Sequence, residues 1–314
     1  MLRKGEVLGN YEILRKLGAG GFGVTYQARD LKLGHDVAIK EYFPEQHATR
    51  EDGIIRPKPG QLEEFEHGRR DFLFEARRLA RFKHPNIVGV SRFLKANNTA
   101  YIVMNFIPGR SLLEWLGEIE GEPPTQPEMD LLAEPLLSAL ELVHKNQMLH
   151  RDIKLSNIMI SDDGRPVLID FGAAREAAGV RSRDIGLFLS RPYTPLEMYS
   201  METARQGPWS DIYSLAVAFY RCMTGVLPPD PTERVRDEVD LPMPSPSDGY
   251  RPQFLIGLEA ALQVNWKKRP QSVAEWRESL FTATSLDRVK QINGHQQERR
   301  LEWIARYFRK VVGR

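Results

Sequence analysis

The segment His150–Asn157, with the sequence HRDIKLSN, constrains this chain more than any other feature. It places a carboxylate at Asp152, a cation at Lys154 and an amide at Asn157, and a second carboxylate follows at Asp170 in the triplet DFG. A carboxylate can accept the proton of an attacking hydroxyl, a lysine can neutralise phosphate charge, and amide and carboxylate oxygens suit hard metal ions. Together these side chains predict a site for phosphoryl transfer.

A glycine-rich stretch, GAGGFG at residues 18–23, lies near the amino end. Apolar runs at residues 11–17 and 24–28 flank it and predict a hairpin whose backbone could fold over phosphate groups. A dinucleotide-binding fold would need a helix directly after the glycines, whereas Val24–Tyr26 contains strand-forming residues. The stretch therefore favours a phosphate-binding hairpin over a dinucleotide fold.

These motifs follow one another in a fixed order, with VAIK ending at Lys40 and a predicted helix at residues 72–82 between them. This order resembles that of the Hanks-type serine/threonine protein kinases. The resemblance implies an α+β fold with two lobes, a small β-rich lobe with one long helix and a larger α-helical lobe. We expect a kinase domain over residues 8–285, with lobes at 8–105 and 110–285, a hinge at 106–109, and a basic amphipathic tail at 286–314.

The resemblance also implies catalytic roles. Asp152 would orient the attacking hydroxyl, and Lys154 would stabilise charge on the transferred γ-phosphoryl group of ATP. Lys40 would contact the α- and β-phosphates while paired with Glu75. The metal ligands implied for two Mg²⁺ ions are Asn157 and Asp170. The lysine two places after the catalytic aspartate is typical of kinases that phosphorylate serine or threonine.

A larger set of residues would bind the nucleotide by the same resemblance. Met104 would lie beside the adenine, the main chains of Asn105 and Ile107 would bond its edge, and Ala38 and Met159 would sandwich the ring. The residues expected around the rest of ATP are Leu17, Gly18, Ala19, Gly20, Gly21, Phe22, Gly23, Thr25 and Lys40. A pocket of this kind is mostly apolar, so these positions would also suit an ordinary core.

Four further positions match supporting residues of the family. Glu197, in Pro195–Glu197, would form a buried ion pair with Arg269. Asp211 would hold the backbone of the catalytic loop through hydrogen bonds. Ser190 would hydrogen-bond both the catalytic aspartate and the catalytic lysine. None of these four residues is expected to react.

The likeness is closer to the bacterial branch of the family, on residues such as KEYFP at 40–44 and the charged insert at 45–70. The activation segment, which lies between Asp170 and Ser190, departs from that branch. Ser182 is its single hydroxyl residue, and Asp184 stands where another is expected. We hypothesise that Asp184, or phosphorylated Ser182, supplies the anion that Arg151 would seek. The alternative is a solvated loop charge.

Composition narrows the remaining choices. A net charge of +2 disfavours nucleic-acid binding. The single cysteine, Cys222, lies in an apolar run and is expected to be buried and reduced, which suits the cytoplasm. The tail at 286–314 could pack on the large lobe, bind an anionic membrane surface, or contact a partner if the native protein is longer.

Three functions are compatible with these observations. The favoured one is a Mg-ATP-dependent serine/threonine protein kinase that acts on other proteins and on itself. The alternative is a kinase-fold scaffold that binds nucleotide or a partner and transfers phosphate poorly. A small-molecule phosphotransferase ranks third, because relatives of that kind often lack the Pro-x-Glu segment. The sequence predicts neither the substrate nor the oligomeric state.

Overall fold

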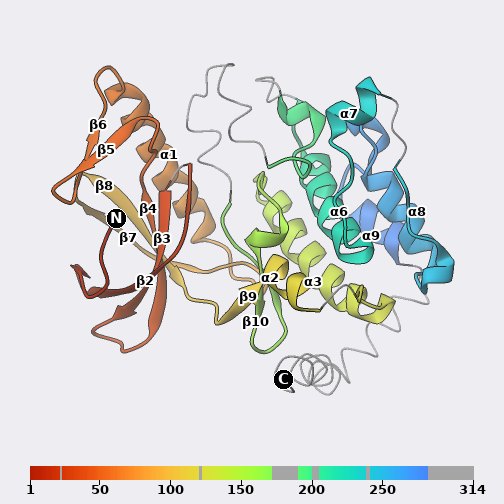
Figure 1. Ribbon diagram of the computed structural model, residues 1–314, viewed down its shortest axis with the longest axis horizontal. Helices are drawn as coiled ribbons and strands as arrows, with labels where there is room; N and C mark the ends of the chain where they lie inside the picture. Colours follow the sequence, from red (N-terminus) through yellow and green to blue (C-terminus); the bar gives the residue numbers. More distant parts are fainter. Residues whose placement is uncertain (22, 120–121, 172–189, 200–204, 238–240, 282–314) are drawn as a thin grey trace. The chain divides into compact units, whose positions relative to one another are not determined.

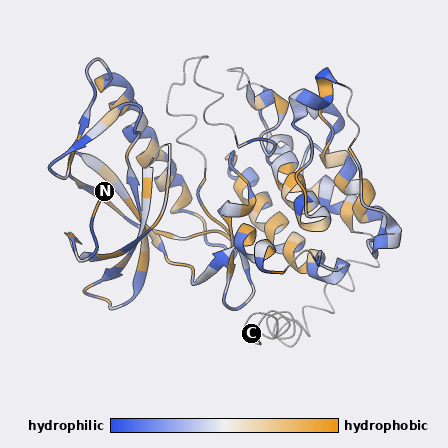
Figure 2. Ribbon diagram, viewed as in Figure 1, coloured by the Kyte–Doolittle hydropathy of each residue, from blue (hydrophilic) through white to orange (hydrophobic). Residues whose placement is uncertain are grey.

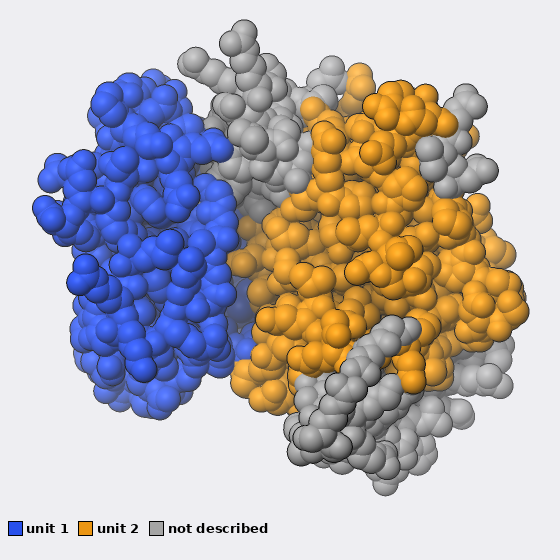
Figure 3. All heavy atoms as spheres, viewed as in Figure 1, with its two compact units in different colours: residues 1–107, 172–188 blue, residues 108–171, 189–314 orange. Residues whose placement is uncertain are grey.

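A computed structural model describes residues 1–21, 23–119, 122–171, 190–199, 205–237 and 241–281 of the chain (Figure 1). They form two compact units, one of residues 1–107 and one that begins at Pro108 (Figure 3). Phe22, Ser182, Asp184 and the predicted tail at 286–314 lie outside the described residues.

The first unit is built on an antiparallel sheet with the strand order β1-β2-β3-β4-β8-β7. The glycine-rich stretch is part of this sheet: its first glycines end one strand and Gly23 begins the next. The hairpin predicted around the glycines is therefore present, with longer strands than expected. The strands are β1 (Val7–Leu8), β2 (Tyr11–Gly20), β3 (Gly23–Asp30), β4 (Asp36–Tyr42), β7 (Val90–Ala96) and β8 (Thr99–Asn105).

The charged insert at residues 45–70 is ordered structure. Its first part is a separate hairpin of β5 (Ala48–Glu51) and β6 (Ile54–Pro57). Asp52 and Gly53 join these strands with φ angles of 48° and 83°, as a tight hairpin turn requires.

The second part of the insert begins the helix α1, which runs over Leu62–Leu79. The predicted bounds of 72–82 were therefore wrong at both ends. The charged residues of the first turns lie on the outer side, while one face buries Phe65, Gly68, Phe72, Glu75, Ala76 and Leu79 at helical spacing. Helix α1 packs against β8.

The second unit combines a small sheet with helices. Its strands β9 (Gly109–Ser111), β10 (Ile158–Ser161) and β11 (Pro166–Leu168) pair antiparallel in the order β11-β10-β9. The helices are α2 (Leu112–Glu118), α3 (Gln126–Lys145), α6 (Pro208–Thr224), α7 (Pro231–Arg236), α8 (Pro252–Ala261) and α9 (Val273–Leu280). Short 3-10 turns cover Leu155–Asn157, Leu196–Tyr199, Pro246–Asp248 and Trp266–Lys268.

Helix α6 forms the centre of this unit. Nearly all its residues from Ser210 to Met223 are buried, as is typical of a helix surrounded by other elements. Figure 2 shows that hydrophobic residues gather on the inner helices. Cys222 is buried here, as predicted, and burial raises the pKa of its thiol. Among the described residues, no helix has the length and apolar character needed to cross a membrane.

Candidate active site

The catalytic loop, residues 150–157, connects α3 to β10 in the second unit. Its backbone is bound to α6 through Asp211, whose side chain is 1% exposed. The two carboxylate oxygens of Asp211 accept hydrogen bonds from the main-chain N–H groups of His150 and Arg151, each at 2.8 Å. His144, near the end of α3, adds a third contact from Nε2 at 2.8 Å. Asp211 thus makes the contacts expected of it, while His144 was missed because a histidine late in a helix is a weak signal.

Burial and hydrogen bonding oppose each other at Asp211. Burial alone would raise the pKa of this carboxyl, but the hydrogen bond and charge of His144, together with the backbone bond from Arg151, lower it overall. The aspartate is therefore held as a carboxylate. A fixed negative charge in this position keeps its acceptor oxygens directed at the loop backbone.

His150 connects the catalytic loop to the DFG triplet. Its ring stacks on Phe171 with centroids 4.2 Å apart, and its Nε2 lies 3.2 Å from the carbonyl oxygen of Ile169. Its Nδ1 accepts the main-chain N–H of Asp152 at 3.3 Å. Burial lowers the pKa of the imidazole, which favours the neutral form with the proton on Nε2.

The catalytic pair lies in one hydrogen-bonded cluster. Lys154 Nζ is 3.0 Å from Asp152 Oδ2 and 3.3 Å from Ser190 Oγ. Ser190 Oγ in turn donates to Asp152 Oδ1 at 3.1 Å, the contact that the resemblance implied. The side chains of Lys154 and Asp152 are 27% and 16% exposed, so solvent reaches both. The cluster can bring a carboxylate and an ammonium group to the same acceptor hydroxyl.

The two predicted metal ligands fit a hard cation. Asn157 donates from Nδ2 to the main-chain oxygen of Asp152 at 2.8 Å and to Oδ2 at 2.9 Å, which leaves its amide oxygen as the ligand atom. Asp170 adds a carboxylate from a backbone with φ of 52°. The described residues contain no group of three or more His, Cys, Asp or Glu that could hold a metal. Two oxygen ligands agree with a metal ion that takes its other ligands from phosphates and water.

The remaining predicted residues of the first unit lie on its central strands and on helix α1. Lys40 is in β4, and Glu75 is on the buried face of α1. The sheet register places Ala38 opposite Met104, and both are buried. Thr25 pairs with Gly18 across the glycine-rich hairpin. The expected adenine-side positions are therefore neighbours in the sheet, whereas Met159 belongs to β10 of the second unit.

The main-chain contact predicted for Asn105 needs one refinement. Its N–H group donates to the carbonyl oxygen of Gly89 at 2.9 Å. Of the main-chain groups of Asn105, only the carbonyl is therefore left for a ligand. Ile107 lies just beyond β8, which ends at Asn105. The sequence could not show that this N–H group is already bonded, because its acceptor, the carbonyl oxygen of Gly89, lies outside β8.

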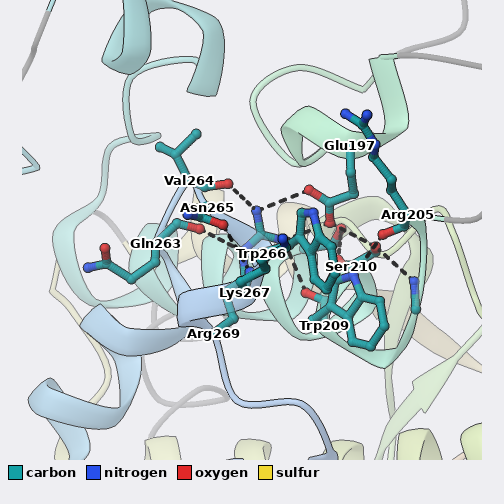
Figure 4. A network of polar contacts seen from close by, with 12 residues as sticks. Glu197, Arg205, Trp209, Ser210, Gln263, Val264, Asn265, Trp266, Lys267 and Arg269 are labelled. Carbon is teal, nitrogen blue, oxygen red and sulfur yellow. Dashed lines mark hydrogen bonds and ion pairs between the residues drawn. The ribbon is translucent and has the colours of Figure 1, made fainter. Parts of the chain in front are cut away.

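A buried ion pair supports the second unit (Figure 4). Arg269 donates to Glu197 Oε1 at 2.8 Å and to Oε2 at 3.2 Å, and the two side chains are 0% and 2% exposed. Ser210 Oγ donates to Glu197 at 2.8 Å. The guanidinium also donates to the carbonyl oxygens of Trp209, Gln263 and Val264. The pairing expected from the sequence is present, and every charged group in it is satisfied.

A further buried carboxylate, Glu41 in the first unit, was not predicted. It accepts hydrogen bonds from Tyr26 at 3.0 Å, Tyr101 at 2.7 Å and Arg50 at 2.6 Å. Arg50 lies on β5, so this contact attaches the hairpin of the insert to β4. An acidic residue directly after Lys40 in an apolar strand was the available signal.

The fold and these clusters define a phosphotransferase of the protein kinase class. The protein kinase domain family matches residues 11–270, and the chain belongs to that family, in its bacterial Hanks-type serine/threonine branch. Protein kinases use ATP with a divalent metal ion to phosphorylate proteins.

Named relatives support this placement. The chain is 32% identical to serine/threonine-protein kinase pkn2 of Myxococcus xanthus over 88% of this chain and 33% of that protein. It is also 32% identical to serine/threonine-protein kinase PrkC of Bacillus subtilis (strain 168) over 73% of this chain and 33% of that protein. The chain thus spans about a third of the length of these curated relatives.

Solved structures show the same fold. The structure described as the PpkA-294 apo form is 35% identical, with a TM-score of 0.79, and the match covers 90% of this chain and 99% of that one. The kinase domain of Mycobacterium tuberculosis PknI is 21% identical, with a TM-score of 0.65 over 89% of this chain and 98% of that one. The second likeness concerns the fold alone.

Proposed function

We propose that this chain transfers the γ-phosphoryl group of Mg-ATP to serine or threonine hydroxyls of proteins, itself included. The observation that carries the proposal is the cluster of Asp152, Lys154, Ser190 and Asn157 in the second unit. It joins a proton acceptor, a cation and an amide through hydrogen bonds, with the amide nitrogen of Asn157 donating to Asp152. Family membership supports the same activity.

In this proposal the substrate hydroxyl approaches Asp152, whose carboxylate orients it and accepts its proton as the phosphoryl group is transferred. Lys154 lies beside the same carboxylate and stabilises charge on the transferred group. Ser190 bridges the aspartate and the lysine, and so keeps both directed at one point. The protein contributes position and charge rather than covalent chemistry.

Asn157 and Asp170 would hold Mg²⁺, which when bound with ATP neutralises charge on the phosphates. Lys40, paired with Glu75, would bind the α- and β-phosphates, and the glycines of the β2–β3 hairpin would cover them. The carbonyl of Asn105 and the N–H group of Ile107 would bond the adenine edge. These contacts come from the family resemblance, and their residues are of the chemical types that such contacts need.

The test is labelled-phosphate transfer from ATP and magnesium to generic protein substrates, with intact-mass spectrometry of the kinase itself. Asp152→Asn should lose about a thousandfold or more in rate, because it removes the proton acceptor and leaves the volume unchanged. Asp162→Asn is the matched control, since its carboxylate is exposed in the β10–β11 turn. Equal activity of wild type and Asp152→Asn would disprove the proposed mechanism.

The same assay decides the scaffold alternative. ATP binding without transfer by the wild type would favour a scaffold, and transfer only to small molecules would favour the third candidate. Phosphate mapped to Ser182 would show that the activation segment is modified, and transfer by Ser182→Ala and by Asp184→Asn would show that neither is needed. Cytoplasmic location and a membrane or partner role for residues 286–314 remain proposals.

A further inference from the structure

The aromatic contact between β4 and α1 joins the two elements that carry Lys40 and Glu75. Tyr42, the last residue of β4, packs against Phe65 and Phe72 of α1, with ring centroids 5.4 and 5.5 Å apart. Its side chain is almost completely buried. The tyrosine ring is therefore held by two phenylalanines that lie two helical turns apart.

Gly68 lies between these two phenylalanines on the buried face of α1. A Cβ atom at Gly68 would lie 2.2 Å from the Tyr42 hydroxyl oxygen and 3.1 Å from the ring carbon that bears it. Because Phe65 and Phe72 pack against the ring, it cannot swing away without disturbing the core. Glycine thus lets the helix approach the tyrosine closely.

The same faces of β4 and α1 carry the proposed phosphate-binding pair. Lys40 and Tyr42 are two residues apart in a strand and point to one side of the sheet. Gly68 and Glu75 are seven residues apart in a helix, which returns them to the same face, and both are buried. The separations are about 7 Å along the strand and about 10 Å along the helix, a difference that long side chains can span.

We propose that Tyr42 and Gly68 are positioning residues, which fix the rotation and depth of α1 so that Glu75 is presented to Lys40. This inference rests on the proposed kinase function. A rotation of α1 at Gly68 is carried rigidly to Glu75 two turns further on. The contact therefore sets the geometry of the phosphate-binding lysine without touching the substrate.

The test introduces the missing Cβ with Gly68→Ala. Alanine favours helices more than glycine does, so local helix formation should not be lost. The added methyl must instead displace Tyr42 or the helix, and we expect kcat/KM for ATP to fall between about tenfold and a hundredfold. Gly117→Ala is the matched control, because this glycine is also helical and its Cβ would meet nothing within 4 Å. The control should keep wild-type activity.

Two further backgrounds separate positioning from general damage. Tyr42→Phe removes the hydroxyl that the new methyl would meet at 2.2 Å, so Gly68→Ala should cost much less in that background. In a Glu75→Gln background, Gly68→Ala should cost little, because the residue that it misplaces has already lost its charge. Thermal unfolding of each variant shows whether stability changes in parallel.

The outcomes are distinct. Wild type that transfers no phosphate would overturn the proposed function, whatever the variants do. Active wild type with an equally active Gly68→Ala variant would overturn this inference alone. So would an equal loss on Gly68→Ala with and without Tyr42→Phe, or with and without Glu75→Gln. Rescue by Tyr42→Phe and a loss that depends on Glu75 would establish the positioning role.

Discussion

The two units each bury a glutamate against an arginine, but they do so differently. In the second unit both partners, Glu197 and Arg269, are removed from solvent, and carbonyl oxygens accept the remaining guanidinium donors. In the first unit Glu41 is buried while Arg50 reaches it from the edge of a hairpin with 12% of its side chain exposed.

The two glutamates also differ in their other partners. Glu41 shares its charge between the arginine and two phenols, those of Tyr26 and Tyr101. Burial raises the pKa of both phenols, and the charge of Glu41 adds to the effect, so they remain donors. Replacing the arginine should therefore lower the free energy of unfolding strongly in the second unit and moderately in the first. Only Glu41 would keep two strong neighbouring donors.

The largest effect is expected for Arg269→Met. It leaves Glu197 buried with Ser210 as its remaining described donor, and the free energy of unfolding should fall by about 3–5 kcal/mol. Urea denaturation followed by circular dichroism measures the change. Lys268→Met, next in the chain but exposed, is the control and should stay within about 0.5 kcal/mol. A loss of less than about 1 kcal/mol for Arg269→Met would contradict the comparison.

Asp211→Asn should have the next largest effect on stability, about 2–3 kcal/mol at neutral pH, because an amide cannot accept from all three present donors. Since folding lowers the pKa of Asp211, its carboxylate stabilises the fold above the unfolded value of 3.8, and this contribution is lost as the pH falls through the folded pKa. The difference in free energy of unfolding between wild type and Asp211→Asn should therefore become smaller below about pH 4. Urea denaturation at a series of acidic pH values measures this difference. If it does not change with pH, the charge of the Asp211 carboxylate is not involved.

The smallest of these effects is expected for Arg50→Met, about 1–2 kcal/mol, since the two tyrosines still donate to Glu41. Arg56→Met is a control on the same hairpin. Arg56 pairs with Glu51 at the surface, where the two side chains are 59% and 61% exposed, so this substitution should cost less than about 0.5 kcal/mol. Thermal unfolding in low and high salt compares the two variants. Equal losses for Arg50→Met and Arg269→Met would remove the distinction between the units.

The sequence predicted the second unit better than the first for a physical reason. The contacts of Asp211, Ser190 and the Glu197–Arg269 pair belong to motifs that identify the family, so they could be assigned without coordinates. The start of α1 was placed too late because its first turns are densely charged and only Phe65 and Gly68 mark the buried face. The β5–β6 hairpin was missed although Asp52-Gly53 is a strong turn signal.

Contacts that depend on tertiary approach could not be predicted. Nothing in the sequence indicates that Gly68 faces the hydroxyl of Tyr42, because the two residues lie in different elements that meet only in the folded chain. The occupied N–H group of Asn105 is a similar case, since its acceptor lies on a neighbouring segment. The roles assigned to the nucleotide and metal ligands stay predictions until they are measured.

The burial of Cys222 has a practical consequence. The chain has one cysteine, and its thiol is enclosed in α6 with a raised pKa, so it should react slowly with maleimides and iodoacetamides. A new cysteine at exposed Phe74, on α1 next to Glu75, would then be the main site of attachment for a spin label or fluorophore. The natural sequence is thus already suited to spectroscopy of α1 in solution, without prior removal of native thiols.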